Sequence, residues 1–260
     1  MASLMPAAFI GHGNPMNALE HNRYTDAWTA FGASLPTPAA ILVVSAHWYV
    51  NITAVTAMRV PRTIHDFYGF PQALFDVDYP APGDPGVAHR IVEVVRPTYV
   101  GMDEDSWGLD HGTWSVLVHM FPRAEVPVLQ LSINAELPFD YHFDLGAQLH
   151  ELRREGVLVL ASGNVVHNLR LADWNRPGQG EVWAHRFDDG ARAIMTSDAS
   201  QLGRIRDHVD YDLAVPTPDH FLPLAYIAGL ASAAATPTST LIDGYEMGSL
   251  SMTAYELPGA

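Results

Sequence analysis

Cysteine is absent from this chain of 260 residues. Disulfides and thiolate metal sites are therefore excluded, and any bound metal must be held by nitrogen and oxygen atoms. Long apolar runs are also missing, since no stretch reaches the ~20 residues that span a bilayer. The first six residues lack the basic and apolar regions of a signal peptide. These absences predict a cytoplasmic protein.

Positive charge is scarce in this sequence. Lys and Arg total 14 against 29 Asp and Glu, which gives a formal net charge of -15. Such a surface repels phosphate backbones and anionic lipids, so neither nucleic acid nor a membrane is expected as a partner. Hydrophobic residues make up 48% of the chain and indicate a buried core rather than disorder. The quaternary state is left open, and a homo-oligomer is compatible with the sequence.

Segments typical of strands and of helices alternate along the chain, without a linker or an internal repeat. Strands are predicted at residues 7–10, 40–47, 53–58, 126–133 and 157–161, with a closing strand or hairpin within 240–257. Helices are predicted at residues 24–31, 84–95, 112–121, 140–155, 183–195 and 221–235. Residues 61–83 and 197–219 are predicted to be irregular, and 53–58 to pair beside 40–47. The pattern predicts one α/β domain over residues 1–260, a sandwich with a mostly parallel or mixed central sheet flanked by helices.

Three histidines each follow an apolar segment that is typical of a buried strand: His12, His47 and His167. In α/β sheets, ligands bind at the edge where the parallel strands end. Imidazoles brought to this edge from distant parts of the chain can converge on one metal ion. A single histidine in such a place is more often a buried, hydrogen-bonded residue, so the prediction depends on the threefold repetition.

Two further histidines stand at predicted helix starts, His111 after Asp110 and His220 after Asp219. The positive end of a helix disfavours imidazolium, so a neutral His111 could accept a proton or bind a phenolic hydroxyl. Both residues are also explained without function, His111 as a surface residue and His220 as packing against its loop.

Aromatic residues near these histidines could form an apolar pocket for an aromatic substrate. The candidates for its walls are Trp48, Tyr49, Phe67 and Tyr68, with His65 as a further pocket residue. The sequence contains no phosphate-binding loop, no dinucleotide fingerprint after a strand, no serine nucleophile elbow and no zinc-protease helix motif.

Five motifs occur together in one order: Gly11-His12-Gly13-Asn14-Pro15, Ser45-Ala46-His47-Trp48, Asp110-His111-Gly112-Thr113-Trp114, Gly163-Asn164-Val165-Val166-His167-Asn168-Leu169 and Pro218-Asp219-His220-Phe221-Leu222-Pro223. This set resembles the LigB-type class III extradiol ring-cleavage dioxygenases, and most of all their 4,5-DOPA dioxygenase extradiol branch. The resemblance extends over nearly the whole chain.

The resemblance implies an oxidoreductase that uses O₂ to open a catechol-type, DOPA-like aromatic to a semialdehyde. It implies one divalent metal, Fe(II) for activity and in some members Zn(II) as isolated. His12, His47 and His220 are implied as ligands, and His167 as a fourth ligand or an acid–base residue. His111 is implied to contact the substrate. Many ring-cleaving relatives have a glutamate in place of His220, so the all-histidine set is also compatible with zinc.

Two other functions remain open from the sequence. A zinc-dependent hydrolase would use a metal-bound water as its nucleophile. A non-catalytic metal-binding or interaction protein would keep the fold and the histidines without turnover. The match in all five motifs favours the dioxygenase.

Overall fold

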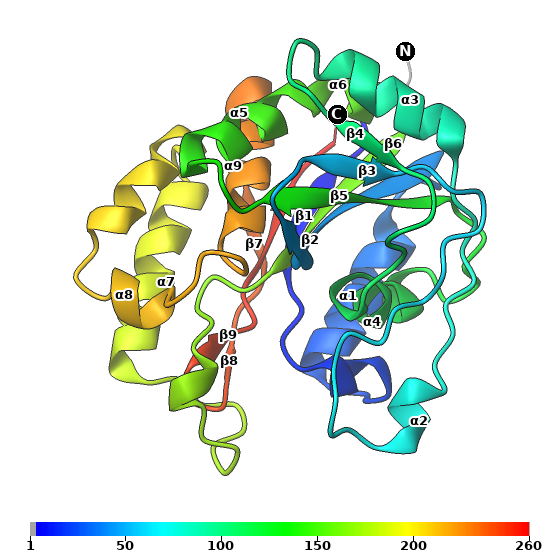
Figure 1. Cartoon of the computed structure of the whole chain (residues 1–260). Coiled ribbons are helices and arrows are strands. Elements are labelled where there is room, and N and C mark those ends of the chain that lie inside the picture. The colour runs from blue at the N-terminus through cyan, green and yellow to red at the C-terminus, as the bar shows by residue number, and fades with distance from the viewer. Residues whose placement is uncertain (1–3, 260) are drawn as a thin grey trace.

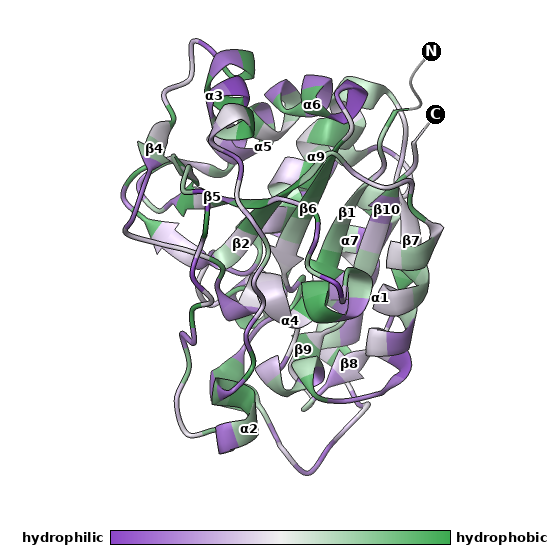
Figure 2. Cartoon of the chain, turned by 90° about the vertical axis from the view of Figure 1, so that its right-hand side faces the viewer, coloured by the Kyte–Doolittle hydropathy of each residue, from purple (hydrophilic) through white to green (hydrophobic). Residues whose placement is uncertain are grey.

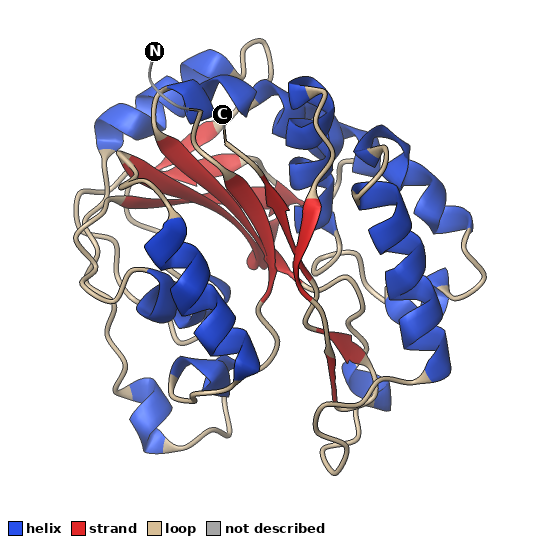
Figure 3. Cartoon of the chain, turned by 180° about the vertical axis from the view of Figure 1, so that it is seen from behind, coloured by secondary structure: helices blue, strands red, loops and turns tan. Residues whose placement is uncertain are grey.

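The computed structural model describes residues 4–259 and shows a sheet covered on both faces by helices (Figures 1 and 3). The sheet has eight strands in the order β4-β3-β5-β2-β6-β1-β10-β7. Its strands are β1 (Ala7–Gly11), β2 (Ala40–Val50), β3 (Ala54–Thr56), β4 (Gly101–Asp103), β5 (Val128–Asn134), β6 (Val157–Gly163), β7 (Ser239–Ile242) and β10 (Ala254–Leu257). A separate small hairpin joins β8 (Tyr245–Glu246) and β9 (Leu250–Ser251).

The four central strands, β5, β2, β6 and β1, run parallel. On one side β10 pairs antiparallel with β1 and β7 with β10, and on the other side β3 pairs antiparallel with β5 and parallel with β4. The α-helices are α1 (Arg23–Ser34), α2 (Gln72–Phe75), α3 (Pro85–Val94), α4 (His111–Met120), α5 (Phe139–Gln148), α6 (His150–Arg154), α7 (Val182–Met195), α8 (Tyr211–Ala214) and α9 (Leu222–Ala234). The 3₁₀ helices are η1 (Pro15–Ala18), η2 (Leu169–Leu171) and η3 (Ala199–Asp207). The predicted α/β class with a mixed sheet flanked by helices is confirmed.

Alternate residues of the central strands enter two different hydrophobic cores. Along β2, Leu42 and Val44 pack into the core that contains α5 and α9, and Ile41 and Val43 pack into the core that contains α1 and α4. A strand buried on both faces has no polar alternation, which explains its continuous apolar sequence. Figure 2 shows the apolar colouring of the strands at the middle of the sheet.

Several details of the secondary structure differ from the sequence-based expectation. β3 does not pair beside β2, because β5 lies between them. β2 runs past His47 to Val50, with a register shift between Val44 and Tyr49. The expected helix over 140–155 is two helices that meet at Leu149.

Residues 197–219 contain η3 and α8, and β4 was not expected at all. These elements are short, and two are 3₁₀ or single-turn helices, which carry no 3.6-residue apolar period for sequence reasoning to detect. Among the described residues, no helix is long and apolar enough to cross a membrane. The cytoplasmic location stays a prediction.

Candidate metal centre

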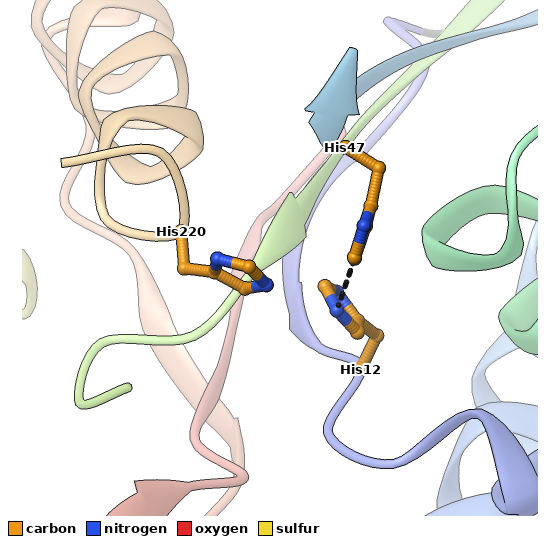
Figure 4. A group of neighbouring side chains, drawn as sticks. All are labelled: His12, His47 and His220. Atoms are coloured by element: carbon orange, nitrogen blue, oxygen red, sulfur yellow. Dashed lines mark hydrogen bonds between the residues drawn. The ribbon is translucent and has the colours of Figure 1, made fainter. Parts of the chain in front are cut away.

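Three imidazoles meet at the carboxyl-terminal edge of the central strands (Figure 4). His12 directly follows β1, His47 lies within the irregular part of β2, and His220 precedes α9. One ring nitrogen from each residue lies within 4.8 Å of the others, and Nε2 of His12 is 3.1 Å from Nε2 of His47. The predicted convergence of distant histidines is therefore present in the fold.

Hydrogen bonds on the far side of each ring indicate which nitrogen carries the proton. Ser162 Oγ donates to the carbonyl oxygen of Gly112 at 2.5 Å, so it accepts from His12 Nδ1 at 2.9 Å. His47 Nδ1 lies 3.0 Å from a carboxylate oxygen of Asp66 and donates to it. His220 Nδ1 donates in the same way to Asp219.

With Nδ1 protonated in all three rings, each Nε2 presents a lone pair. Two lone pairs that face each other at 3.1 Å, as in His12 and His47, repel unless a cation lies between them. Two cis ligands about 2.1 Å from one divalent ion would stand roughly 3.0–3.4 Å apart. The donor set therefore fits a metal ion, and the carboxylates behind the rings are the partners that orient metal-bound histidines in proteins.

Asp66 is the residue of this site that sequence reasoning missed. Its carboxylate accepts from His47 through one oxygen, and through the other from Nδ1 and the backbone N–H of His111, each at 2.9 Å. These hydrogen bonds lower the pKa of Asp66 despite its burial and keep it ionised. Asp66 lies in the long loop before α2, where no local pattern marks it, and the aromatic context instead pointed to the adjacent His65.

His167 lies at the site but not in the three-ring group. Its ring stacks on that of His220, with centroids 3.5 Å apart and planes inclined by 3°. Burial lowers the pKa of His167 to about 2, helped by His220, so its ring is neutral. The structure brings it into the cavity wall beside the metal-ligand candidates.

Burial also governs the protonation of the other imidazoles. It lowers the pKa of His12 well below its ordinary value, helped by His47, and lowers the pKa of His220 and His111. For His47, burial opposes protonation, but the hydrogen bond to Asp66 and the charge of Asp110 outweigh it and raise the pKa. Neutral imidazole is the form that binds a metal.

The backbone approaches these side chains closely at two glycines. A Cβ at Gly112, in the first turn of α4, would stand 2.8 Å from His47 Cδ2 and from Ser45 Oγ. A Cβ at Gly163, the last residue of β6, would stand 2.2 Å from the carbonyl oxygen of His220. Only glycine lets α4 and the start of α9 approach the strand ends closely enough to form the site.

A cavity of about 420 Å³ opens over the three rings. Two of the predicted substrate-binding residues, Phe67 and Tyr68, line it, as do His111 and His167. The other two lie outside its lining: Trp48 stacks on Trp107, and His65 is turned toward the carbonyl oxygen of Val77. Tyr49 is not part of the lining either.

Several lining residues were not expected from the sequence. They come from four segments far apart in the chain and comprise Gly13, Asn14, Pro15, Phe70, Leu169, Trp174, Met247 and Leu250. Because loops bring these residues together, no sequence period could have identified them.

The fold and the site define an α/β protein with a histidine-rich candidate metal centre in a cavity partly lined by aromatic side chains. Residues 14–257 match the family described as the catalytic LigB subunit of aromatic ring-opening dioxygenase. The chain is 48% identical over 257 residues to the 4,5-DOPA dioxygenase extradiol of Escherichia coli K12, covering 97% of this chain and 94% of that protein.

A Beta vulgaris protein of the same name is 35% identical over 86% of this chain and 85% of its own length. A crystal structure of an uncharacterised Escherichia coli K12 protein superposes with a TM-score of 0.85 at 43% identity, covering 98% of this chain and all of the other. The chain belongs to the LigB family. The predictions of this family, of an extradiol ring-cleavage dioxygenase and of metal dependence are confirmed.

Proposed function

We propose that this enzyme inserts O₂ into a DOPA-like catechol and opens the ring next to the diol to give a semialdehyde. The observation that carries the proposal is the convergence of one ring nitrogen from each of three histidines in the lining of a cavity that also contains aromatic side chains. Its volume of about 420 Å³ suits a compound with one substituted ring. The relatives named for DOPA support this class of substrate.

The proposed metal ligands are His12, His47 and His220, with Fe(II) as the active metal. A bound ferrous ion would supply Lewis acidity toward the diol oxygens and redox activity toward O₂. The same three nitrogens suit Zn(II), so zinc in the isolated protein is part of the proposal. Asp66 and Asp219 hold the rings in the ligating tautomer and place negative charge behind them.

His111 and His167 are the proposed catalytic residues. Nδ1 of His111 donates to Asp66, so its Nε2 is left to accept the proton of a phenolic hydroxyl. His167 is a neutral ring that lines the cavity, and it can take a proton as the diol binds and return it during ring opening. Phe67 and Tyr68 form part of the aromatic wall.

One experiment tests the whole proposal. Protein loaded with Fe(II) is mixed with a catechol without oxygen, and O₂ is then added. We expect oxygen uptake equal to the catechol consumed and a yellow ring-opened product. Iron-loaded protein that gives no such product from any catechol would refute the proposal, and full oxygen-independent hydrolysis with zinc would instead select the hydrolase.

We also propose that the chain forms one catalytic domain over residues 1–260. In support, β1 near the start of the chain pairs with β10 near its end, and β6 lies on the other side of β1. The central sheet thus needs strands from both ends of the sequence.

A further inference from the structure

We propose that this cavity selects its catechol by the charge at the end of the ring substituent. Substituents that end in an ammonium or an uncharged group are preferred over those that end in a carboxylate, and Tyr68 and Trp174 hold the substituent. The proposal rests on the proposed function in one respect, because the diol must lie at the three histidines for the substituent to point outward.

Two aromatic side chains stand at the mouth of the cavity. Tyr68 and Trp174 both line it, yet their exposed fractions are 92% and 66%. Tyr68 belongs to the loop before α2 and Trp174 to the loop between η2 and α7, and these loops lie on opposite sides of the molecule below the sheet (Figure 1). A solvent-exposed aromatic ring offers a face for an alkyl chain or an ammonium group.

The start of α4, one of the helix starts at this cavity, is already occupied by acids. The N-terminus of α4 lies at the cavity, where its positive dipole end favours anions. However, the backbone N–H of His111 donates to Asp66, and that of Thr113 donates to Asp110. The start of α4 therefore offers no open amide groups to a substrate carboxylate.

Two of the arginine side chains near the sequence motifs bind other partners. Arg23 pairs with Asp243 at 2.8 Å, and Arg62 donates to the carbonyl oxygen of Ser106 at 2.5 Å. Arg59 and Arg170 are not among the residues that line the cavity. The sequence contains no lysine, and its net charge of -15 adds a long-range field that attracts cations and repels anions.

The first test is equilibrium binding without oxygen, measured by calorimetry on zinc-loaded protein at low salt. The probes are three catechols with the same two-carbon arm: dopamine, 4-ethylcatechol and 3-(3,4-dihydroxyphenyl)propionate. We expect dopamine to bind about tenfold more tightly than the propionate, as two exposed cation–π contacts would give, with 4-ethylcatechol between them. Added salt should reduce the difference between the dissociation constants of dopamine and the propionate, because dissolved ions screen the charge of the protein.

Substitutions of Trp174 and Tyr68 test whether these two side chains cause the selectivity. Trp174→Leu and Tyr68→Leu should each bring the dissociation constants of dopamine and 4-ethylcatechol closer together, and Trp174→Phe should keep most of the difference because it retains an aromatic face. Tyr99→Leu is the matched control, since Tyr99 is also exposed but lies outside this cavity. Tighter or equal binding of the propionate would overturn the proposal, as would an unchanged difference in the Trp174→Leu, Tyr68→Leu double variant.

This test is separable from that of the proposed function. If dopamine binds preferentially but iron-loaded protein cleaves none of the three catechols, the charge selectivity stands and the ring-cleavage proposal fails. If all three are cleaved and the propionate binds best, ring cleavage stands and the charge selectivity fails.

Discussion

Hydrogen bonds behind the imidazoles decide which nitrogen of each ring faces the cavity. Ser162 can only accept from His12, because its own proton goes to the backbone of Gly112. Carboxylates fix the other two rings in the same tautomer. His167 differs from these three histidines. Its ring stacks parallel to that of His220, and within residues 4–259 no side chain accepts a hydrogen bond from it. These contacts suit His12, His47 and His220 to the role of ligands and His167 to that of an acid–base residue.

Two alanine variants distinguish these roles. His220→Ala should lose the metal, because two nitrogens remain of the three. His167→Ala should retain about one metal per chain yet lose a factor of roughly 10²–10⁴ in ring-cleavage rate, as removal of an acid–base group does. Metal analysis and oxygen uptake on the same samples check both expectations. Loss of the metal from His167→Ala would make this histidine a ligand instead.

Asp66 deserves a variant of its own because it holds two histidines at once. Asp66→Asn should weaken metal affinity about 10–100-fold, the usual effect of removing a carboxylate that orients a ligand. A competition titration with a chromogenic chelator measures this change. Asp76→Asn is the matched control, since Asp76 lies in the same region of chain but bonds only Gln72 among side chains. Equal affinities of the two variants would contradict the role of Asp66.

At the scale of elements, a buried carboxylate ties α7 to the strands that close the fold. Asp188, fully buried on α7, accepts hydrogen bonds from Tyr245, Ser251 and Thr253, and pairs with Arg192 at 2.9 Å. The segment it holds includes Leu250, which lines the cavity and bridges to His167. The hydrogen bonds of Asp188 therefore position the hairpin segment that forms one wall of the site.

Asp189, the next residue along α7, provides a control for the hydrogen bonds of Asp188. Asp188→Asn places an amide among four donors and should lower the free energy of unfolding by roughly 2–4 kcal/mol. Asp189→Asn, at a side chain that is 65% exposed, should change it by less than ~0.5 kcal/mol. Urea denaturation of both variants checks the difference. Equal denaturation midpoints of the two variants would mean that the hydrogen bonds of Asp188 contribute little to stability.

Helices α5 and α9 pack closely because glycines face backbone atoms, and a buried histidine joins them. A Cβ at Gly229 would stand 2.0 Å from the carbonyl oxygen of Phe143. His142 Nδ1 lies 3.0 Å from the hydroxyl of Tyr226, and burial lowers the pKa of His142 from 6.5 to about 4. Protonation of His142 would place a positive charge in the core between α5 and α9.

This histidine should make stability depend on pH. Between pH 6.5 and about 4 the unfolded chain holds the proton and the folded chain does not. Stability therefore falls as the pH falls through this window, by about 3 kcal/mol in total. His142→Asn should reduce the slope of unfolding free energy against pH, and His89→Asn, at an exposed histidine, should not. An unchanged slope in His142→Asn would show that another group causes the dependence.

At the scale of the whole molecule, the candidate metal would join parts of the chain that are 208 residues apart, from His12 to His220. An ion that binds only the folded arrangement stabilises it by mass action, by about 4 kcal/mol when its free concentration is a thousand times its dissociation constant. The site thus links the central strands β1 and β2 to the start of α9.

Removal of the metal should consequently lower the thermal stability. Zinc-loaded protein should unfold roughly 10 °C above chelator-treated protein, the shift that such a free energy gives in a chain of this size. Circular dichroism during heating measures it. His220→Ala should show no difference between the two conditions. If this variant responds to the chelator as the wild type does, the metal binds elsewhere.

The sequence by itself determined the α/β class, most strand and helix positions and the placement of His12, His47 and His167 at one edge of the sheet, whereas His220 was implied as a ligand by the family resemblance. Buried parallel strands have a distinctive apolar composition, and their ends meet at one edge whatever the loops do. Only the tertiary structure decided that Asp66 rather than His65 serves the site, that Trp48 lies outside the cavity and that Trp174 stands at its mouth. Side chains on loops are placed by contacts with distant segments, and no local pattern in the sequence records such contacts.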